Sequence, residues 1–440
     1  MMNNKIYDDF IVDCAKMIAI DSVIAPAKPQ QPFGAKIDLA LKTILDISEK
    51  LGYQTFCDPE GYYGYAEIGD NQSELFGILC HVDVVPANDL GKWYTDPFEL
   101  MIENNKLYGR GIQDDKGPTL LCLYAIKHLL EQGYQPKKRI RFIFGTDEEN
   151  LWRCIKRYQM NEEIPQAGIA PDSIFPVTNA EKGLLQFDLI AEEKIKFTMQ
   201  GGEAYNSVAA QVQTTYSDVL AKELKSNKIK YTDIDDRIEV FGTSAHVKDA
   251  DKGDNAIVKL AQVFKKMDYQ SRMLDFIVEK GSDPHGTLLF GEVCDEVSGQ
   301  LMMNIGKASF AYEKQKISCD LRIPVTYDKK KIDSVINDIC QEYQLTYQLV
   351  DYVEPLYVNE DTSLVQNLMK AYQEVIHDYE TKPLASGGAT YARAMANFVA
   401  FGADLPTSKT MAHQANECAD IEDYKVAFKI YVEAFKLLLF

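Results

Sequence analysis

The chain has 440 residues, which is too long for one typical hydrophobic core and predicts two domains. Its 47 basic and 66 acidic residues give a net charge of −19, which excludes nucleic acid and anionic membranes as binding partners because phosphate groups need clustered Lys and Arg. No signal peptide is recognisable and no run approaches the roughly 18 apolar residues of a membrane span, so we expect a cytoplasmic protein.

The expected elements of the first 184 residues alternate between helices and strands. Apolar spacing predicts helices over 8–22, 36–52 and 118–133 and strands over 75–85 and 139–149. This order is typical of a parallel or mixed sheet flanked by helices. Open α/β sheets bind their ligands where the strands end, so the residues that follow these strands are candidates for a functional site.

The pattern of expected helices and strands changes near residue 185. We expect extended chain over 183–202, helices over 255–267 and 329–344, and strands over 308–325 and 345–352. No cluster of metal-ligand residue types occurs there, which predicts a separate inserted α+β domain over 185–353. Long helices return over 363–378 and 421–439, so the first domain is expected to comprise 1–184 and 354–440.

The cysteines predict a reducing environment. The nine residues are scattered, odd in number and without a CxxC pair, and several lie in apolar runs. This pattern is typical of buried thiols rather than of a disulfide framework.

His81 and Asp83 end the strand expected over 75–85. Residues two apart in extended chain project to the same face, so the carboxylate can orient the imidazole. A lone histidine at a strand end is the alternative interpretation.

Asp114 and Asp115 follow a glycine-rich turn and precede an apolar helix. One interpretation is a helix N-cap, in which a carboxylate accepts from free N–H groups. The other is a metal site, because adjacent carboxylates repel each other unless a cation offsets them. In that case one Asp binds metal and the other is held by Lys116 or by backbone groups.

Glu148 and Glu149 end the strand expected over 139–149. Consecutive side chains of extended chain point in opposite directions, so one can bind metal while the other acts as a general base. An exposed acidic turn is the alternative. Asp172 and His413 complete the set, and such carboxylates and imidazoles suit borderline divalent ions such as zinc.

The ordered motifs HVD, GRGIQDDKGP, TDEE, PD, SAH, LRIP, GGATYAR and HQANE resemble those of the M20 family of metallopeptidases. Within that family the chain is most similar to the dipeptidase V (PepV-like, carnosinase-type) branch, over essentially its full length. The resemblance implies a metallopeptidase catalytic domain, a mixed sheet flanked by helices, with an inserted α+β lid domain that closes over a small peptide. It also implies two divalent ions, zinc in the first place and Mn²⁺ or Co²⁺ as alternatives.

The resemblance assigns five metal ligands in two sets that share one residue. The sets are His81 and Asp172 for one ion and Glu149 and His413 for the other, with Asp114 bridging both.

Further roles follow from the same resemblance. Glu148 is the implied general base, which takes a proton from the bridging water and later delivers it to the leaving amine. Asp83 is implied to hold His81, and a cis peptide is implied between Asp114 and Asp115.

The expected lid supplies the other implied contacts. His246 matches the residue that stabilises the tetrahedral oxyanion, and Arg322 matches the one that binds the substrate's C-terminal carboxylate, for which a guanidinium fork is well suited. Asn206 is implied to be a further polar contact. Gly388 and Ala389 lie in a turn expected to contact the same carboxylate end.

The implied activity is hydrolysis of dipeptides with a free N-terminus through a metal-bridging hydroxide. A deacylase of N-acyl amino acids or N-succinyl-diaminopimelate is one alternative, because it breaks the same kind of bond. A weakly catalytic peptide-binding homologue is another, although such a protein does not need Glu148. A monomer is expected, with a homodimer as the alternative. The departures from the family pattern at Leu151, Ile323 and Ala389 spare the ligands and bear on substrate preference.

Overall fold

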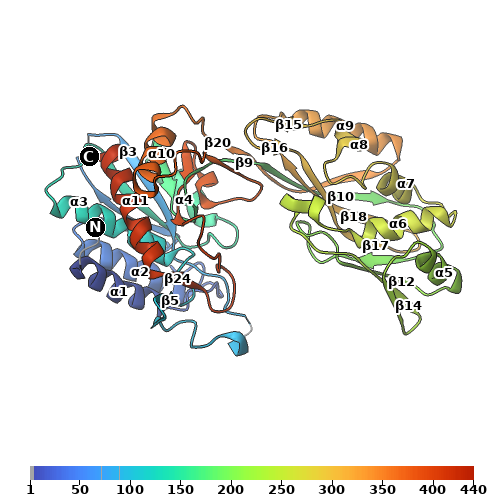
Figure 1. Cartoon of the computed structure of the whole chain (residues 1–440), viewed down its shortest axis with the longest axis horizontal. Coiled ribbons are helices and arrows are strands. Elements are labelled where there is room, and N and C mark those ends of the chain that lie inside the picture. The colour runs from blue at the N-terminus through green and yellow to red at the C-terminus, as the bar shows by residue number, and fades with distance from the viewer. Residues whose placement is uncertain (1–3, 71, 89) are drawn as a thin grey trace. The chain divides into compact units, whose positions relative to one another are not determined.

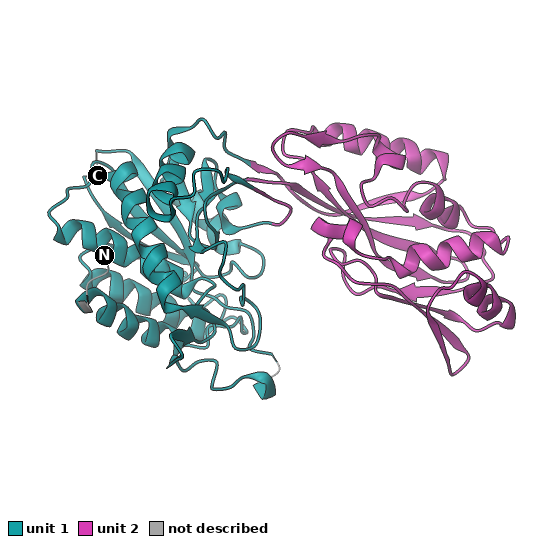
Figure 2. Cartoon of the chain, in the orientation of Figure 1, with its two compact units in different colours: residues 1–179, 357–384, 389–440 teal, residues 180–356, 385–388 magenta. Residues whose placement is uncertain are grey.

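The computed structural model describes residues 4–70, 72–88 and 90–440. The chain forms two compact units (Figure 2). Unit 1 comprises Met1–Asn179, Tyr357–Leu384 and Ala389–Phe440, and unit 2 comprises Ala180–Leu356 and Ala385–Gly388. Both ends of the chain belong to unit 1 (Figure 2), so unit 2 is an insertion. The inserted segment expected over 185–353 lies inside unit 2, and its role as a lid stays a prediction.

Unit 1 is built on a nine-stranded mixed sheet. Strands β3, β6, β7 and β22 form its parallel centre, and β1 and β2 extend it in antiparallel fashion. In sheet order the strands are β1 (Gln54–Cys57), β2 (Tyr63–Ile68), β6 (Arg139–Gly145), β3 (Leu75–His81), β7 (Ala167–Ala170), β22 (Phe398–Ala400), β9 (Thr178–Glu181) and β20 (Leu356–Tyr357), with β21 (Leu384–Ser386) on β9.

Six helices of the described chain accompany this sheet. They are α1 (Asn4–Ile18), α2 (Ala35–Lys50), α3 (Lys116–Glu131), α4 (Arg153–Asn161), α10 (Ser363–Ile376) and α11 (Ile421–Leu439). Helix α3 packs between α1 and α11 (Figure 1), which explains why it is buried over most of its surface. Helix α1 ends earlier than expected, because the Lys116 ammonium donates to the backbone oxygens of Met17 and Ile20 there.

A small three-stranded sheet connects distant parts of unit 1. Strand β5 (Lys106–Tyr108) pairs with β4 (Met101–Glu103) on one side and with β24 (Cys418–Asp420) on the other. The segment before β24 is therefore held against the turn after β5. A second small pair joins β8 (Ser173–Ile174) to β23 (Ala403–Asp404).

Unit 2 is an α+β unit with its own hydrophobic core. Its eight-stranded antiparallel sheet runs in the order β13 (Tyr231–Ile234), β14 (Arg237–Phe241), β12 (Gln211–Thr215), β11 (Met199–Gly201), β17 (Met302–Phe310), β18 (Gln315–Ile323), β10 (Gly183–Ala191) and β19 (Thr346–Val353). Its helices are α5 (Asp218–Ser226), α6 (Ala256–Lys266), α7 (Arg272–Glu279), α8 (Thr287–Phe290) and α9 (Lys329–Glu342), and β15 (Cys294–Asp295) pairs with β16 (Gly299–Gln300).

Two expectations for unit 2 were wrong in detail. The single strand expected over 308–325 is a hairpin of β17 and β18, whose turn is closed by the N–H of Ala311 donating to the oxygen of Lys314. The extended run over 183–202 is broken between β10 and β11. There Glu193 leaves the sheet and accepts hydrogen bonds from Ser271 and Arg272 at the start of α7.

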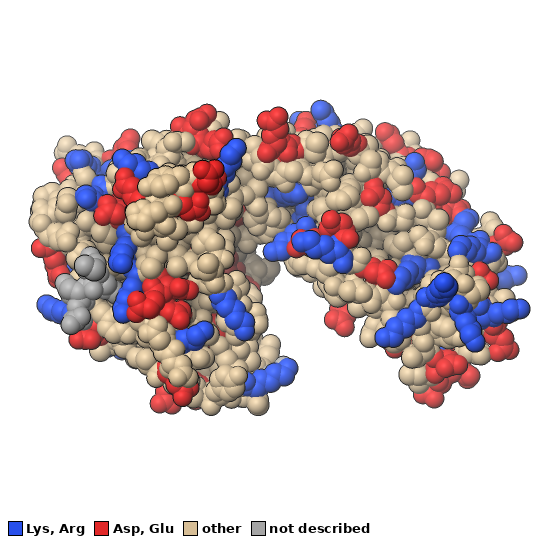
Figure 3. Space-filling view, viewed as in Figure 1, with Lys and Arg blue, Asp and Glu red and all other residues tan. Residues whose placement is uncertain are grey.

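Three further features concern the length of the helices, the cysteines and the surface charge. No helix in the described ranges is both long and apolar enough to cross a membrane. All nine cysteines are free thiols, and five of them are buried. Acidic and basic side chains are interspersed over the visible face of the molecule (Figure 3).

Close backbone packing holds the centre of the unit 1 sheet together. A methyl group added at Gly168 would collide with the backbone oxygen of Gly77 and with the ring of Phe398. Because overpacking of this kind costs about 1–3 kcal/mol, we predict that Gly168→Ala lowers the free energy of unfolding by that amount in urea titration. Gly91→Ala is the control, since that position has open space around it. Equal stability of the two variants would contradict this prediction.

Candidate metal centre

His81 lies at the end of β3, fully buried. Its Nδ1 atom contacts the backbone oxygen of Asp83 at 2.9 Å, with the Asp83 carboxylate at 3.6 Å. Its Nε2 atom lies 3.0 Å from Asp114 Oδ1 and 3.8 Å from Asp172 Oδ2, yet it makes no hydrogen bond among the described residues. A buried imidazole nitrogen that faces two carboxylates without bonding to either has the geometry of a metal ligand.

The Asp83 carboxylate has a second task that the sequence did not reveal. It accepts hydrogen bonds from the backbone N–H groups of Glu148 (3.1 Å) and Glu149 (3.0 Å). The His81 ring is thus held chiefly by the backbone of Asp83, while the side chain fixes the turn that carries the two glutamates. The parallel pairing of β3 with β6, which sets His81 opposite Gly145, brings these segments together.

Asp114 and Asp115 are joined by the expected cis peptide bond. Asp115 directly precedes α3 but its side chain accepts no capping hydrogen bond, so the capping interpretation is wrong. Its carboxylate instead accepts from the backbone N–H of His81 (3.1 Å) and the Thr119 hydroxyl (3.0 Å). A backbone N–H and a threonine hydroxyl, rather than Lys116, therefore hold it, and Asp114 faces the histidine.

His413 forms the second cluster from a loop near the end of the chain. Its Nε2 atom lies 2.9 Å from Asp114 Oδ2 and 3.2 Å from Glu149 Oε2, and 53 % of its side chain is exposed. Its backbone is left-handed, with φ of 63°, a conformation that costs a non-glycine residue of the order of 1–3 kcal/mol. Such a conformation persists only where the surroundings enforce it.

Glu417 is a site residue that the sequence analysis left without a role. Its buried carboxylate accepts from the backbone N–H groups of Gly111 (3.1 Å) and Gln113 (2.8 Å) and from the Arg110 guanidinium (2.6 Å). It therefore fixes the turn that leads to Asp114. Its place in the HQANE motif was the available signal, but only the pairing of β24 with β5 shows what it binds.

The donor set fits two divalent cations. His81, Asp114 and Asp172 form one group and Asp114, Glu149 and His413 the other, with one ligand atom from each residue lying within 4.8 Å of the others in its group. Mixed nitrogen and oxygen donors with one shared carboxylate suit two adjacent borderline ions. The structure brings together all five expected ligands, and their roles as ligands are taken up below as proposals.

Burial and mutual repulsion raise the pKa values of two carboxylates in this centre. Burial raises the pKa of Glu148 to about 8, with repulsion from Asp114 and Glu149 adding to the effect. Burial and the neighbouring Asp114 likewise raise the pKa of Asp172 well above its usual range. These shifts express a surplus of negative charge that a bound cation would relieve.

The pKa values of the two histidines are also raised, in their case by the neighbouring carboxylates. Hydrogen-bond contacts with Asp114 and Glu149 raise the pKa of His413 to about 10. For His81, burial lowers the pKa, but the carboxylates of Asp114 and Asp83 outweigh it and the net pKa is well above the ordinary value. Both shifts have the same cause, which is attraction between an imidazole ring and the carboxylates that face it.

In unit 2, His246 and Asn206 belong to two neighbouring segments. Ser207 and His246 form an isolated antiparallel bridge, and the N–H of Val247 donates to the oxygen of Asn206 (2.8 Å). The N–H of Lys248 donates to His246 Nδ1 (3.2 Å), so the neutral ring carries its proton on Nε2. Burial and the positive charge of Arg322 lower the pKa of His246, which favours this neutral form.

Arg322 lies on β18 and is only 4 % exposed. Its guanidinium binds both carboxylate oxygens of Asp320 (2.7 and 3.1 Å) and donates to the oxygen of Gly387 (3.0 Å). The expected substrate turn is divided, because Gly388 belongs to unit 2 whereas the exposed Ala389 belongs to unit 1.

Comparison with known proteins places this geometry in a family. The family described as Peptidase family M20/M25/M40 matches residues 77–437. The chain belongs to the M20 peptidases. It is 31% identical to "Putative dipeptidase YtjP" of Bacillus subtilis, over 97% of this chain and 96% of that protein. It is 33% identical to "Putative dipeptidase SAB1611c" of Staphylococcus aureus, over 97% of each.

Solved structures of M20 peptidases and their relatives share the fold. Human carnosine dipeptidase 1 matches with a TM-score of 0.60 and 15% identity, covering 99% of this chain and 98% of that one. An M20 family metallo-carboxypeptidase from Sulfolobus solfataricus matches with a TM-score of 0.58 and 18% identity, covering 97% and 98%. This M20 peptidase therefore has the expected α/β fold with an inserted α+β unit.

The shared position of Asp114 predicts unequal effects of ligand substitutions on metal content. We expect two ions per chain, none after Asp114→Ala, and one after His413→Ala, as measured by elemental analysis of purified protein. Chelation should lower the unfolding temperature, because ions at 100 times their Kd stabilise the folded state by about 2.7 kcal/mol per site. Two ions retained by His413→Ala would contradict this assignment.

Proposed function

We propose that this M20 peptidase is a metal-dependent dipeptidase that hydrolyses dipeptides with a free N-terminus. The observation that carries the proposal is the pair of ligand groups that share Asp114, with Glu148 beside them. The full-length similarity to relatives named as putative dipeptidases supports the choice of substrate.

We assign two divalent ions to the ligand groups of unit 1. Zinc is the first candidate because the groups combine imidazole and carboxylate donors, and Mn²⁺ and Co²⁺ are alternatives. When bound, such ions would polarise the scissile carbonyl and make water nucleophilic near neutral pH.

Glu148 is the proposed general base. Neither ligand group of the described chain includes it, although its backbone N–H is bound to Asp83, which also holds His81. Its carboxylate is therefore placed beside the ligands and left available for proton transfer. Glu148 takes the proton of the attacking water and returns it to the amine that leaves.

His246 and Arg322 of unit 2 are the proposed substrate contacts. A neutral His246 ring with its proton on Nε2 can donate to the oxygen that gains charge in the transition state. An arginine has five N–H donors, and the hydrogen bonds of Arg322 to Asp320 and Gly387 use three of them. One donor on each terminal nitrogen is left for the substrate's C-terminal carboxylate.

The remaining assignments are also proposals. Asn206, Gly388 and Ala389 are further substrate contacts, and unit 2 is the lid. The nine free cysteines support a reducing, cytoplasmic environment. We propose a monomer as the active form, with a homodimer as the alternative.

A substrate panel tests the proposed function. Metal-loaded protein is assayed with dipeptides, the same dipeptides acetylated at the N-terminus, and N-acetyl and N-succinyl amino acids. We expect cleavage of the free dipeptides. Cleavage confined to the N-blocked compounds would identify a deacylase instead. No cleavage of any compound would point to a peptide-binding homologue.

The separate roles of the two adjacent glutamates can be distinguished. Glu148→Ala should abolish turnover, by at least about a hundredfold, and leave the metal content intact, because a general base is lost without a ligand. Glu149→Ala is the matched control and should lose metal and activity together. If Glu148→Ala also lost its metal, the base assignment would be wrong.

Carboxylate recognition by Arg322 is tested by Arg322→Lys, which keeps a cation beside Asp320 but removes the planar fork. Because a hydrogen bond to a charged group contributes about 1.5–3 kcal/mol, KM for dipeptides should rise roughly tenfold to a hundredfold. Dipeptide amides, which lack the carboxylate, are the control and should be cleaved as by the unmodified protein. An equal loss for both substrate classes would refute the assignment.

A further inference from the structure

Asn304 lies near the start of β17 and is buried, with 3 % of its surface exposed. Its side-chain nitrogen donates to the backbone oxygens of Tyr205 (2.8 Å) and Ser207 (2.9 Å). These two carbonyl groups stand immediately before and after Asn206. A single amide group therefore holds the chain on both sides of a proposed substrate contact.

The segment held by Asn304 is also tied to His246. The oxygen of Asn206 accepts from the N–H of Val247, and the N–H of Val208 donates to the oxygen of Ala245, each at 2.8 Å. The chain around Asn206 and the chain around His246 thus form one small ladder. A displacement of the first segment would be transmitted to the second through these bonds.

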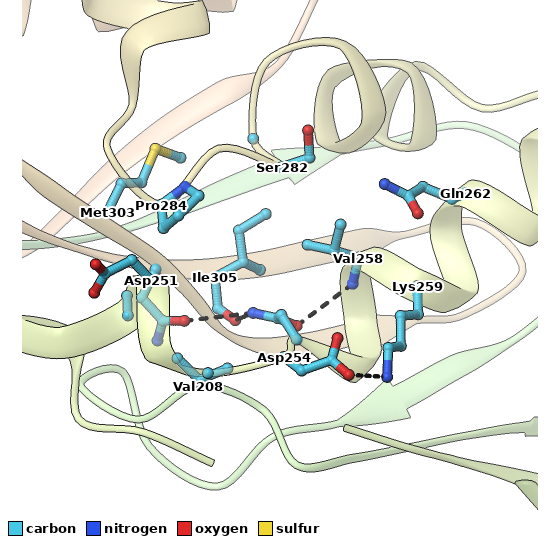
Figure 4. Close-up of a pocket in the computed structure, with 15 residues that line it drawn as sticks. Val208, Asp251, Asp254, Val258, Lys259, Gln262, Ser282, Pro284, Met303 and Ile305 are labelled. Carbon is cyan, nitrogen blue, oxygen red and sulfur yellow. Dashed lines mark hydrogen bonds and ion pairs between the residues drawn. The ribbon is translucent and has the colours of Figure 1, made fainter. Parts of the chain in front are cut away.

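Hydrogen bonds rather than close packing determine where the Asn304 side chain points. The residue lines a cavity of about 220 Å³, among whose walls are Val208, Val258 and Ile305 (Figure 4). A group beside open space makes fewer dispersion contacts than one in a dense core. Asn255 completes the arrangement, since its side chain donates to the oxygen of Ile305 at 2.9 Å and approaches Asn304 Oδ1 at 3.4 Å.

Asn304 and the anchor of Arg322 are direct neighbours in the sheet. Asn304 on β17 is paired in register with Asp320 on β18, and Asp320 binds the Arg322 guanidinium through both oxygens. Gln186 on β10 is the next residue in the same row and donates to Asp320 (2.8 Å). One polar row across three strands therefore supports two of the proposed substrate contacts.

We propose that Asn304 is a positioning residue that sets the place of Asn206 and, through the ladder beside it, of His246. The inference rests on the proposed function, because it assigns Asn304 a task in the hydrolysis of dipeptides. The physical reason is that a donor pair shared between two flanking carbonyl groups removes the freedom of the residue between them. Catalytic contacts lose effect steeply when they are displaced by about 1 Å.

Two variants of Asn304 and one control separate positioning from stability. Asn304→Ala removes both donors, and Asn304→Asp keeps the volume but sets oxygen atoms against the two carbonyl groups. Thr214→Val is the matched control in the same sheet, because the buried Thr214 hydroxyl donates to the backbone oxygen of Thr198 (2.7 Å) and this bond involves neither Tyr205 nor Ser207. All variants are compared well below their unfolding temperatures.

Hydrogen exchange tests, independently of activity, whether the two bonds from Asn304 hold the chain around Asn206. Exchange in the peptide covering residues 203–209 should accelerate roughly tenfold in Asn304→Ala and Asn304→Asp, because the loss of two bonds allows the segment to open locally. Thr214→Val should leave this peptide unchanged. Unchanged exchange in both Asn304 variants would overturn the inference, whatever the enzyme hydrolyses.

Kinetics test the consequence for catalysis. Asn304→Ala should lower kcat for dipeptides roughly tenfold to a hundredfold with little change in KM, whereas Thr214→Val should lower neither. In an Asn206→Ala background the same substitution should cost less than it does in the unmodified protein, since only the effect transmitted to His246 is left.

The outcomes for function and for positioning are distinguishable. If the unmodified protein cleaves no dipeptide, the proposed function fails. The exchange result alone then decides whether Asn304 holds the chain around Asn206. If it cleaves dipeptides but Asn206→Ala has no effect, or the losses of the two substitutions multiply, the positioning role is wrong and the dipeptidase proposal stands.

Discussion

Repulsion among buried carboxylates around Asp114 is the constraint on which this structure depends. Several of these groups are satisfied by fixed donors within the fold. Asp83 and Asp115 accept backbone N–H bonds, and Glu417 accepts both backbone and guanidinium bonds. The carboxylates of the candidate metal centre instead face the rings of His81 and His413. The fold thus separates carboxylates that hold the architecture from those whose oxygen atoms are available to a cation.

The pairing of the strands brings together residues that are far apart in the sequence. Parallel pairing of β3 with β6 and β7 sets the residues that follow these strands at one edge of the sheet. The pairing of β24 with β5 then adds a segment some 300 residues away in the chain, as the bond from Gly111 to Glu417 spans 306 positions. Apolar periodicity makes the strands and long helices of unit 1 predictable, and the ligand types and their order make the metal centre predictable. The supporting bonds are long-range and leave no local pattern.

In unit 2, two features could not be predicted from sequence patterns. The run from Ala308 to Val325 alternates on both sides of a polar stretch over 313–316. It has no glycine or proline at the place where the chain reverses, so the usual turn signals of a hairpin are missing from the sequence. Asn304 is hidden for a different reason. A buried asparagine in an apolar strand reveals nothing about its partners, because they lie 99 and 97 positions away. Resemblance to a family identifies the candidate ligands and substrate contacts. The residues that support these candidates, such as Asn304, are identified only by their contacts in the structure.

The two units possess independent hydrophobic cores, one formed by residues of unit 1 and the other by residues of unit 2. Mutational effects on distant, separately packed sites combine additively in most proteins. Each unit can therefore accumulate substitutions in its own core without loss of stability in the other. The proposed metal ligands of unit 1 and the proposed substrate contacts of unit 2 rest on separately stabilised frameworks.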